Sequence, residues 1–198
     1  MSNLNYYQEI ELIEQPDVSI GVIWSKLYTQ LHFALADLKN KTGVQTIGIS
    51  FPEYNDPNFP LGRRLRLFAA TEKELNELAV SLWLSRLTDY VKVKDIHAVP
   101  LKRVRGYATF SRKEIKRNPE AIARRRARKD PGITYEEALR RAKLQEREIC
   151  LLPFVSLNSL TSGQRFKLFI DRKEETGPRE SLEFSSYGLS NNTAVPIF

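Results

Sequence analysis

The sequence of 198 residues predicts an α+β fold in two parts. Three observations support this expectation. The first half alternates strand and helix patterns, the composition shifts near residue 100, and the second half contains a helix that is unusually rich in arginine. A chain of this length can bury a sizeable apolar core.

The first half contains two amphipathic helices among its strands. From Val18 to Lys39 apolar residues recur at helical spacing, and Gly43 is a suitable end for that helix. Thr71 and Glu74 form a capping-box signature at the start of the second helix. The expected elements are a strand over 5–14, a helix over 18–39, strands over 46–51 and 63–70, a helix over 71–87 and a strand over 91–100. This β-α-β-β-α-β order predicts a ferredoxin-like domain, an arrangement that many RNA-binding modules share.

After Pro100 the pattern changes. Asn118 as N-cap and Pro119 at the first helical position start the arginine-rich helix, which ends at Asp130. Further elements expected are an extended segment over 102–110, a helix over 134–148 opened by a second capping box, and strands over 151–157, 165–171 and 182–188. The predicted division is therefore a ferredoxin-like domain over residues 1–100 and a C-terminal α+β domain with the arginine-rich helix over residues 101–198.

The positive charge of the chain is concentrated in one segment. The formal charge of the whole chain is +7, but Leu101 to Lys129 alone holds 12 Lys/Arg against two acids, a local charge of +10. A base excess that lies in one segment indicates a basic site rather than a generally basic surface.

Cysteine and histidine are scarce. Cys150 is the single cysteine, so no internal disulfide can form, which fits a reducing cytoplasm. One Cys and two His nearly exclude a zinc site. We therefore expect no cofactor, and any catalysis should be metal-free or use a loosely held ion. The N-terminus lacks a signal-peptide pattern, and no window approaches the ~20 apolar residues of a membrane helix, so no membrane partner is expected.

The arginine-rich helix presents one broad basic face. Arg124, Arg125, Arg128 and Lys129 lie at i, i+1, i+4 and i+5, and like charges at such spacings destabilise an isolated helix by roughly a few tenths of a kcal/mol per pair. A polyanion along that face would reverse the effect. A solvated basic face is the plain alternative, but the basic segment upstream favours nucleic-acid binding. The charge alone does not distinguish RNA from DNA.

RNA carries its own nucleophile, the 2′-hydroxyl, so its cleavage requires mainly proton transfer, which a histidine can perform near neutral pH. His32 lies at the edge of the buried stripe of the first long helix, where it can face a cleft. Helix position alone favours the alternative, a partly exposed histidine without function. His97 is expected to be structural or on the surface.

Five segments, in their order and spacing, carry a family resemblance: LHFAL (31–35), IGISFP (47–52), SRKEIKRNPE (111–120) with the arginine-rich helix, LPFVSLNSLTSGQRFKLFI (152–170) and SSYGLSNNTAVPIF (185–198). Along nearly its whole length the chain resembles the type I-F CRISPR repeat-processing endoribonucleases. This resemblance implies a ferredoxin-like domain followed by a domain with the arginine-rich helix. It also implies a metal-independent cut of the CRISPR precursor transcript on the 3′ side of the repeat stem-loop, with 2′,3′-cyclic phosphate and 5′-hydroxyl products. The implied enzyme is a monomer when alone and stays on the hairpin beside the other subunits of a type I-F surveillance complex.

The resemblance also assigns catalytic roles. The family's catalytic histidine falls on His32, the serine that holds the 2′-hydroxyl on Ser159, and the tyrosine that orients the histidine on Tyr187. Without the resemblance, Ser159 would be interpreted as a turn residue and Tyr187 as a strand aromatic. The residues leave open whether His32 acts as acid or base.

Further residues are implied to contact RNA. Phe166 would stack under the terminal base pair, and Arg112 would contact a guanine edge, whose O6 and N7 acceptors suit a guanidinium. The phosphate contacts fall on the four cations of the basic face, and Arg126 is more basic than the family pattern. At Glu114 the family has a glutamine that contacts adenine. A carboxylate only accepts, so we expect an altered base preference one pair above the foot of the stem.

Two other functions are compatible with the sequence. A non-catalytic RNA-binding or assembly protein could use the same folds, with the His/Ser/Tyr set in a structural role. A DNA-binding regulator is less well supported, because the sequence has neither a helix-turn-helix signature nor dimer heptads.

Overall fold

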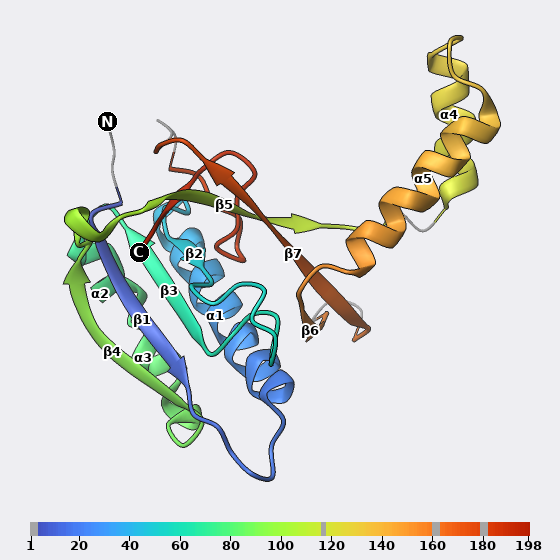
Figure 1. The fold of residues 1–198 in the computed structure, drawn as a ribbon. Coiled ribbons are helices and arrows are strands. Elements are labelled where there is room, and N and C mark those ends of the chain that lie inside the picture. The colour runs from blue at the N-terminus through green and yellow to red at the C-terminus, as the bar shows by residue number, and fades with distance from the viewer. Residues whose placement is uncertain (1–3, 116–117, 160–162, 179–181) are drawn as a thin grey trace. The chain divides into compact units, whose positions relative to one another are not determined.

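The computed structural model describes residues 4–115, 118–159, 163–178 and 182–198. Among these residues helices accompany two four-stranded sheets, as expected for an α+β protein (Figure 1). The chain forms two compact units, one of Met1–Arg112 with Pro153–Phe198 and the other of Lys113–Leu152. The domain boundary expected near residue 100 stays a prediction.

The first sheet contains the strands expected in the first half of the chain. β1 (Tyr6–Leu12) lies between β3 (Arg64–Ala69) and β4 (Val91–Ala98), and the short β2 (Gly48–Ser50) pairs with β3. The pairings are antiparallel and the strand order is β2-β3-β1-β4. The predicted order of strands and helices along this half is confirmed.

Helix α1 (Ile20–Thr42) positions the candidate histidine and packs against both the first sheet and β6 (Phe154–Asn158) of the second sheet. Its predicted apolar stripe is buried, with Leu27, Leu31 and Leu35 fully inside the core. The helix ends where predicted. Gly43 adopts the left-handed conformation (φ 79°), and its N–H donates to the carbonyl of Lys39.

The second helix of the first half is shorter than predicted. The capping box at Thr71 is present, but Ala79 adopts a left-handed conformation (φ 48°) and ends the helix. Three short elements replace it: α2 (Glu72–Leu78), α3 (Val80–Trp83) and the 3-10 helix η1 (Ser85–Leu87). Leu78 and Val80 are both buried although they lie only two positions apart. One continuous helix could not place both on the same face, so the break at Ala79 allows both to enter the core.

The second sheet has the strand order β6-β7-β5-β8. Its strands are β6 (Phe154–Asn158), β7 (Arg165–Glu175), β5 (Gly106–Lys113) and β8 (Val195–Ile197). A short 3-10 helix, η2 (Leu101–Arg103), precedes β5. The strand predicted over residues 182–188 is wrong. Its described residues form a loop, and the N–H of Gly188 donates to the carbonyl of Ser185 at 2.8 Å. Serine and a left-handed glycine (φ 68°) favour a tight turn, and this local preference overrides the partial alternation that suggested a strand.

The second unit contains two helices, α4 (Pro119–Lys129) and α5 (Tyr135–Cys150), which pack against each other. Both predicted N-caps are confirmed. The side-chain oxygen of Asn118 accepts the N–H of Ala121 at 2.8 Å, and the hydroxyl of Thr134 accepts the N–H of Glu137 at 3.2 Å. The residues buried in this unit are small: Ala123, Ala138 and Ala142.

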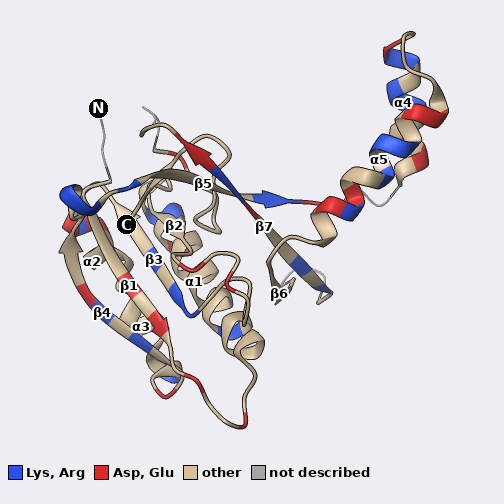
Figure 2. Ribbon diagram, viewed as in Figure 1, with Lys and Arg blue, Asp and Glu red and all other residues tan. Residues whose placement is uncertain are grey.

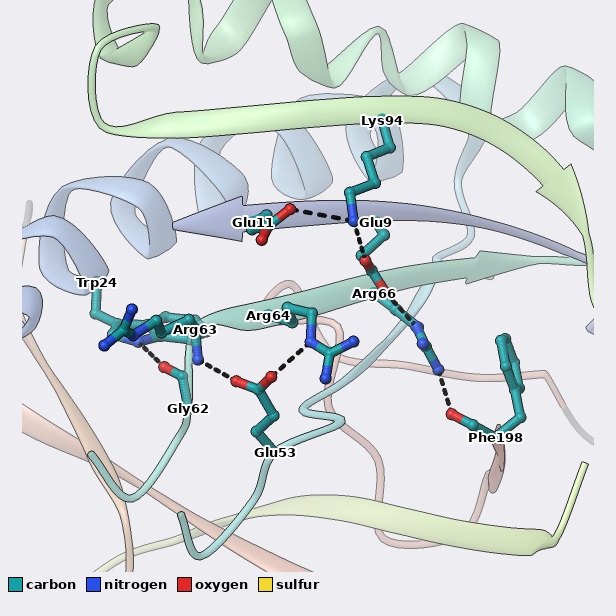
Figure 3. A network of polar contacts seen from close by, with 10 residues as sticks. All are labelled: Glu9, Glu11, Trp24, Glu53, Gly62, Arg63, Arg64, Arg66, Lys94 and Phe198. Atoms are coloured by element: carbon teal, nitrogen blue, oxygen red, sulfur yellow. Dashed lines mark hydrogen bonds and ion pairs between the residues drawn. The ribbon is translucent and has the colours of Figure 1, made fainter. Parts of the chain in front are cut away.

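An ion network around the buried carboxylate of Glu9 joins three strands of the first sheet (Figure 3). The carboxylate of Glu9, whose side chain is only 8% exposed, accepts from Arg66 Nε and Lys94 Nζ at 2.7 Å each. Lys94 also contacts Glu11 at 3.1 Å, and Arg66 donates to the backbone oxygen of Phe198 at 2.8 Å. Burial alone would raise the pKa of Glu9, but the hydrogen bonds from Lys94 and Arg66 outweigh burial and hold that pKa below its ordinary value.

Candidate active site

His32 projects from α1 at the edge of the buried stripe, between the core residue Leu31 and the half-buried Phe33. Its Nδ1 lies 2.9 Å from the backbone oxygen of Ser186. A carbonyl can only accept, so this hydrogen bond requires the proton on Nδ1. The neutral imidazole then has its lone pair on Nε2, which can accept a proton.

The loop from Ser185 to Leu189 supplies that carbonyl. The hydroxyl of Ser185 accepts the N–H groups of Tyr187 and Leu189 at 3.3 Å each, and the backbone N–H of Ser185 donates to Leu189 at 2.8 Å. The carbonyl of Gly188 accepts the N–H of Ile49 in β2 at 2.9 Å. The loop is therefore bonded within itself and to the first sheet, which fixes the atoms that face His32.

Tyr187 stacks on His32. The two ring centroids lie 4.2 Å apart and the ring planes differ by 7°. The buried Tyr28, one helical turn before His32 in α1, donates its hydroxyl to the backbone oxygen of Tyr187 at 2.9 Å. Burial, with a smaller contribution from the neighbouring phenol of Tyr187, raises the pKa of Tyr28 far above its ordinary value, so Tyr28 remains a hydrogen-bond donor.

His32, Ser159 and Tyr187 line the same cavity of about 180 Å³, and Phe166 lies in its wall. Ser159 follows β6, where its backbone bonds to Gly163 and Gln164 at 2.8 Å each. The remaining lining residues are Thr29, Phe33, Leu157 and Asn158. Four side chains that the sequence placed in the site, from α1, the end of β6, β7 and the loop, are therefore brought together.

Arg112 lies beside this cavity. It is exposed near the end of β5, and its guanidinium carbon lies 5.5 Å from the ring centroid of Tyr187 and 5.7 Å from that of Phe166. A second hollow of about 260 Å³ is lined by Arg112 and by the loop, including Tyr187 and Asn191. The two hollows share Tyr187, so a cation borders the cavity on that side.

The basic face of α4 belongs to the second unit. Arg124, Arg125, Arg128 and Lys129 are all exposed and line a shallow hollow of about 460 Å³ on this helix. Figure 2 shows lysine and arginine along α4. Within the described residues none of these four cations forms an ion pair, which leaves their charge available to an anion. Arg126 is exposed on the same helix.

Two predicted residues are not among those that line the cavity. Glu114 is exposed in the segment that follows β5 and belongs to the unit that contains α4. His97 is exposed on β4, with its ring 6.1 Å from that of Tyr7, and it takes no part in the cavity. This agrees with the surface position expected for His97.

Sequence reasoning missed two contributors to the site. Tyr28 lies four positions before His32 and was indistinguishable from the rest of the buried stripe, so its hydroxyl gave no separate signal. Ser186 contributes a backbone carbonyl, a group that every residue has and that no sequence pattern marks.

The described residues contain neither a cluster of metal-binding side chains nor a helix suited to a membrane. No three His, Cys, Asp or Glu side chains in this part of the chain gather in a way that could hold a metal ion. No helix among the same residues has both the length and the apolar character needed to cross a bilayer.

The arrangement combines a proton acceptor, a hydroxyl group in the same small cavity and a guanidinium beside it. A family model described as "CRISPR-associated protein (Cas_Csy4)" matches residues 7–198, so the chain belongs to the Csy4 family, which confirms the resemblance drawn from the sequence.

Two relatives match at full length. A protein of Escherichia coli (strain UTI89 / UPEC) named CRISPR-associated endonuclease Cas6/Csy4 is 35% identical over 195 residues, which cover 98% of this chain and 100% of the relative. A protein of the same name from Pseudomonas aeruginosa (strain UCBPP-PA14) is 33% identical over 195 residues, with the same coverage of both chains.

Proposed function

We propose that this chain is a metal-independent, stem-loop-specific endoribonuclease that cleaves CRISPR precursor transcripts on the 3′ side of the repeat hairpin. Membership of the Csy4 family and the two relatives named as endonucleases support this proposal. The observation that carries it is the single cavity lined by His32, Ser159 and Tyr187.

In the proposed reaction His32 acts as general base. Because its Nδ1–H donates to the carbonyl of Ser186, its Nε2 takes the proton from the 2′-hydroxyl, which Ser159 positions. The 2′-oxygen forms a bond to phosphorus, the bond from phosphorus to the 5′-oxygen breaks, and the 5′-oxygen takes up a proton from water, while His32 returns its proton to the solvent. The products are a 2′,3′-cyclic phosphate and a 5′-hydroxyl. Tyr187 holds the imidazole plane in place through the stack.

The hairpin is bound by both units in this proposal. Phe166 stacks under the terminal base pair and Arg112 contacts a guanine edge. The phosphates of the stem are neutralised by the cations of the basic face: Arg124, Arg125, Arg128 and Lys129. The enzyme remains on the hairpin as part of a type I-F surveillance complex in the cytoplasm.

We also infer a ferredoxin-like domain over residues 1–100 and a C-terminal RNA-binding domain over residues 101–198. The strand order β2-β3-β1-β4 with α1 and α2 packed against the sheet supports the first domain. The clustering of exposed cations on α4 supports the role of the second.

The test is a cleavage assay on a repeat hairpin in EDTA. Wild-type protein should cut the RNA under chelation, and His32→Ala should bind with similar affinity but give no product. His97→Ala is the matched control, because it removes the other histidine from an exposed position, and it should cut like wild type. A single 2′-deoxy nucleotide at the cut site should preserve affinity and abolish product.

Three results would contradict the proposal. Binding without cleavage by wild-type protein would identify a non-catalytic RNA-binding or assembly protein. Cleavage that disappears in EDTA and returns with added Mg²⁺ would identify a metal-dependent nuclease. Cleavage of the 2′-deoxy substrate would exclude attack by the 2′-oxygen.

A further inference from the structure

A groove of about 830 Å³ runs alongside α1, next to the His32 cavity. Its walls are α1 on one side, the segment from Glu77 to Leu87 on another, and the β6–β7 pair on a third. On α1 the lining extends from Ser25 to Lys41, which at 1.5 Å per residue corresponds to about 24 Å. At this length the groove can hold a short segment of an extended chain molecule.

The groove and the cavity are neighbours in the structure. Thr29 of α1 and Asn158 of β6 line both hollows. On another side, the cavity shares Tyr187 with the hollow that contains Arg112. The cavity therefore has one hollow beside it on the side of Arg112 and another, the groove, on the side of Thr29 and Asn158.

The cations of the groove are suited to a polyanion. Lys26, Arg86 and Arg165 are exposed, and none of them forms an ion pair with another described residue. The two acids in the lining are already neutralised. Asp37 pairs with Lys41 at 2.6 Å, and Glu77 pairs with Lys73 at 3.6 Å.

The groove also offers an aromatic surface. Trp83 is half-buried in α3, and beside it Leu82 is 74% exposed. Bases of single-stranded nucleic acid stack on aromatic side chains while cations follow the backbone, and this combination tolerates any sequence. A half-buried tryptophan beside unpaired cations favours a single strand over a regular duplex.

We propose that this groove binds the single-stranded RNA immediately 3′ of the cut. The proposal rests on the endoribonuclease function proposed above. In that function the hairpin lies 5′ of the scissile phosphate, on the side of Arg112, so the groove receives the opposite flank. Lys26, Arg86 and Arg165 contact its phosphates, and Trp83 stacks on a base.

The test compares two uncleavable hairpins, each with a 2′-deoxy nucleotide at the cut site. One ends a single nucleotide after the cut, and the other continues with about eight uridines, within the range of known single-strand sites. Wild-type protein should bind the extended RNA about tenfold more tightly, in keeping with one stacked base. Each phosphate contact to a single strand adds ~0.7 to the steepness of the plot of log affinity against log salt concentration. Three such contacts should therefore make the slope for the extended RNA steeper by about 2 than the slope for the short RNA.

Three variants should each reduce this preference while binding the short hairpin as wild type does: Lys26→Ala, Arg86→Ala and, with the largest loss, Trp83→Ala. Lys92→Ala removes an equally exposed lysine from β4 and should keep the preference. Equal binding of the two RNAs by wild-type protein would overturn the proposal, and so would variants that weaken both RNAs alike. A groove that binds protein instead of RNA would give equal binding of the two RNAs. The endoribonuclease function is tested separately with the short hairpin. If wild-type protein does not bind the 2′-deoxy form of this hairpin and does not cleave its all-ribose form, the proposed endoribonuclease function fails as well.

Discussion

The ring of Tyr187 lies parallel to the imidazole of His32, with 4.2 Å between the centroids. The contact is made by the faces of the two rings, and among the described residues the only hydrogen bond of the imidazole is the one that Nδ1–H donates to the carbonyl of Ser186. Tyr187 therefore contacts His32 through its ring plane, and its loop contacts Nδ1 through the neighbouring carbonyl. Neither contact uses the hydroxyl of Tyr187, so the ring and the hydroxyl can be tested separately.

Substitution of Tyr187 should reveal this separation. Tyr187→Phe keeps the stack and should cleave at a rate close to wild type. Tyr187→Ala removes the stack and frees the imidazole to rotate, which should slow cleavage by about 10²-fold. Single-turnover rates at saturating protein measure the chemical step apart from binding. A Phe variant as slow as the Ala variant would show that the hydroxyl, not the ring, is required.

Tyr28 should act as a positioning residue. Tyr28→Phe removes the hydrogen bond to the backbone oxygen of Tyr187, which should lower the free energy of unfolding by ~1 kcal/mol. The single-turnover rate should fall several-fold at unchanged RNA affinity, because the loop that contacts His32 loses an anchor. Tyr54→Phe is the matched control, since the hydroxyl of Tyr54 donates to the carbonyl of Ile170 at 2.8 Å. The control should lose a similar amount of stability and keep the wild-type cleavage rate. Equal cleavage rates in the two variants would show that Tyr28 has no positioning role.

Gly188 should tolerate no side chain. Its φ of 68° is unfavourable for other residues, and a Cβ there would lie 2.6 Å from the side chain of Ile49. We expect Gly188→Ala to cost roughly 1–3 kcal/mol of stability and to slow cleavage, because relief of the clash displaces the loop. Gly43→Ala has a similar φ of 79° with no atom within 4 Å of the added Cβ, so it isolates the backbone strain. The control should lose stability without a change in cleavage rate, and a slowed control would show that strain alone explains the effect.

Most of the fold could be predicted from the sequence because the helices and strands follow local patterns. The apolar stripe of α1, the capping box at Thr71 and the N-cap at Asn118 are each determined by residues within one or two helical turns. The failures occurred where tertiary packing or turn chemistry dominates. Ala79 breaks a helix so that residues on both sides can be buried, and Gly188 turns a segment that alternates like a strand.

The site could be predicted only through the family resemblance. His32 and Tyr187 are separated by 155 positions, and no periodicity in the sequence indicates that their rings meet. Ser159 was interpretable only as a turn residue, and its place in the cavity could not be read from the residues around it. The structure adds the physical link, since residues from four parts of the chain line one cavity.

Glu9 should make stability depend on pH. Its pKa is lowered in the folded protein, so the unfolded chain binds its proton more readily. The stabilisation is complete above the ordinary pKa of ~4.3 and is lost as the pH falls through the lower folded pKa. Glu9→Gln should lower the free energy of unfolding by roughly 3 kcal/mol near pH 7, because it leaves Arg66 buried without its carboxylate.

Urea unfolding of both proteins at a series of pH values measures this effect. The difference between wild type and Glu9→Gln should shrink below about pH 4. Glu14→Gln is the control, because Glu14 pairs with Arg63 at 3.0 Å while 71% exposed, and it should cost less than ~1 kcal/mol at any pH. A difference for Glu9→Gln that stays constant down to pH 3 would mean that the carboxylate contributes nothing through its charge.

Glu114 should change which base pair is preferred one step above the foot of the stem. A carboxylate accepts but does not donate, so it can contact cytosine N4 or adenine N6 but cannot make the paired contact to adenine N6 and N7 that an amide makes. Glu114→Gln should therefore shift preference toward adenine by about tenfold. Cleavage rates on four hairpins, one for each pair at that level, measure the shift. Glu120→Gln neutralises an exposed acid in the first turn of α4 and should leave the preference unchanged. If wild type and Glu114→Gln rank the four hairpins identically, Glu114 does not contact a base.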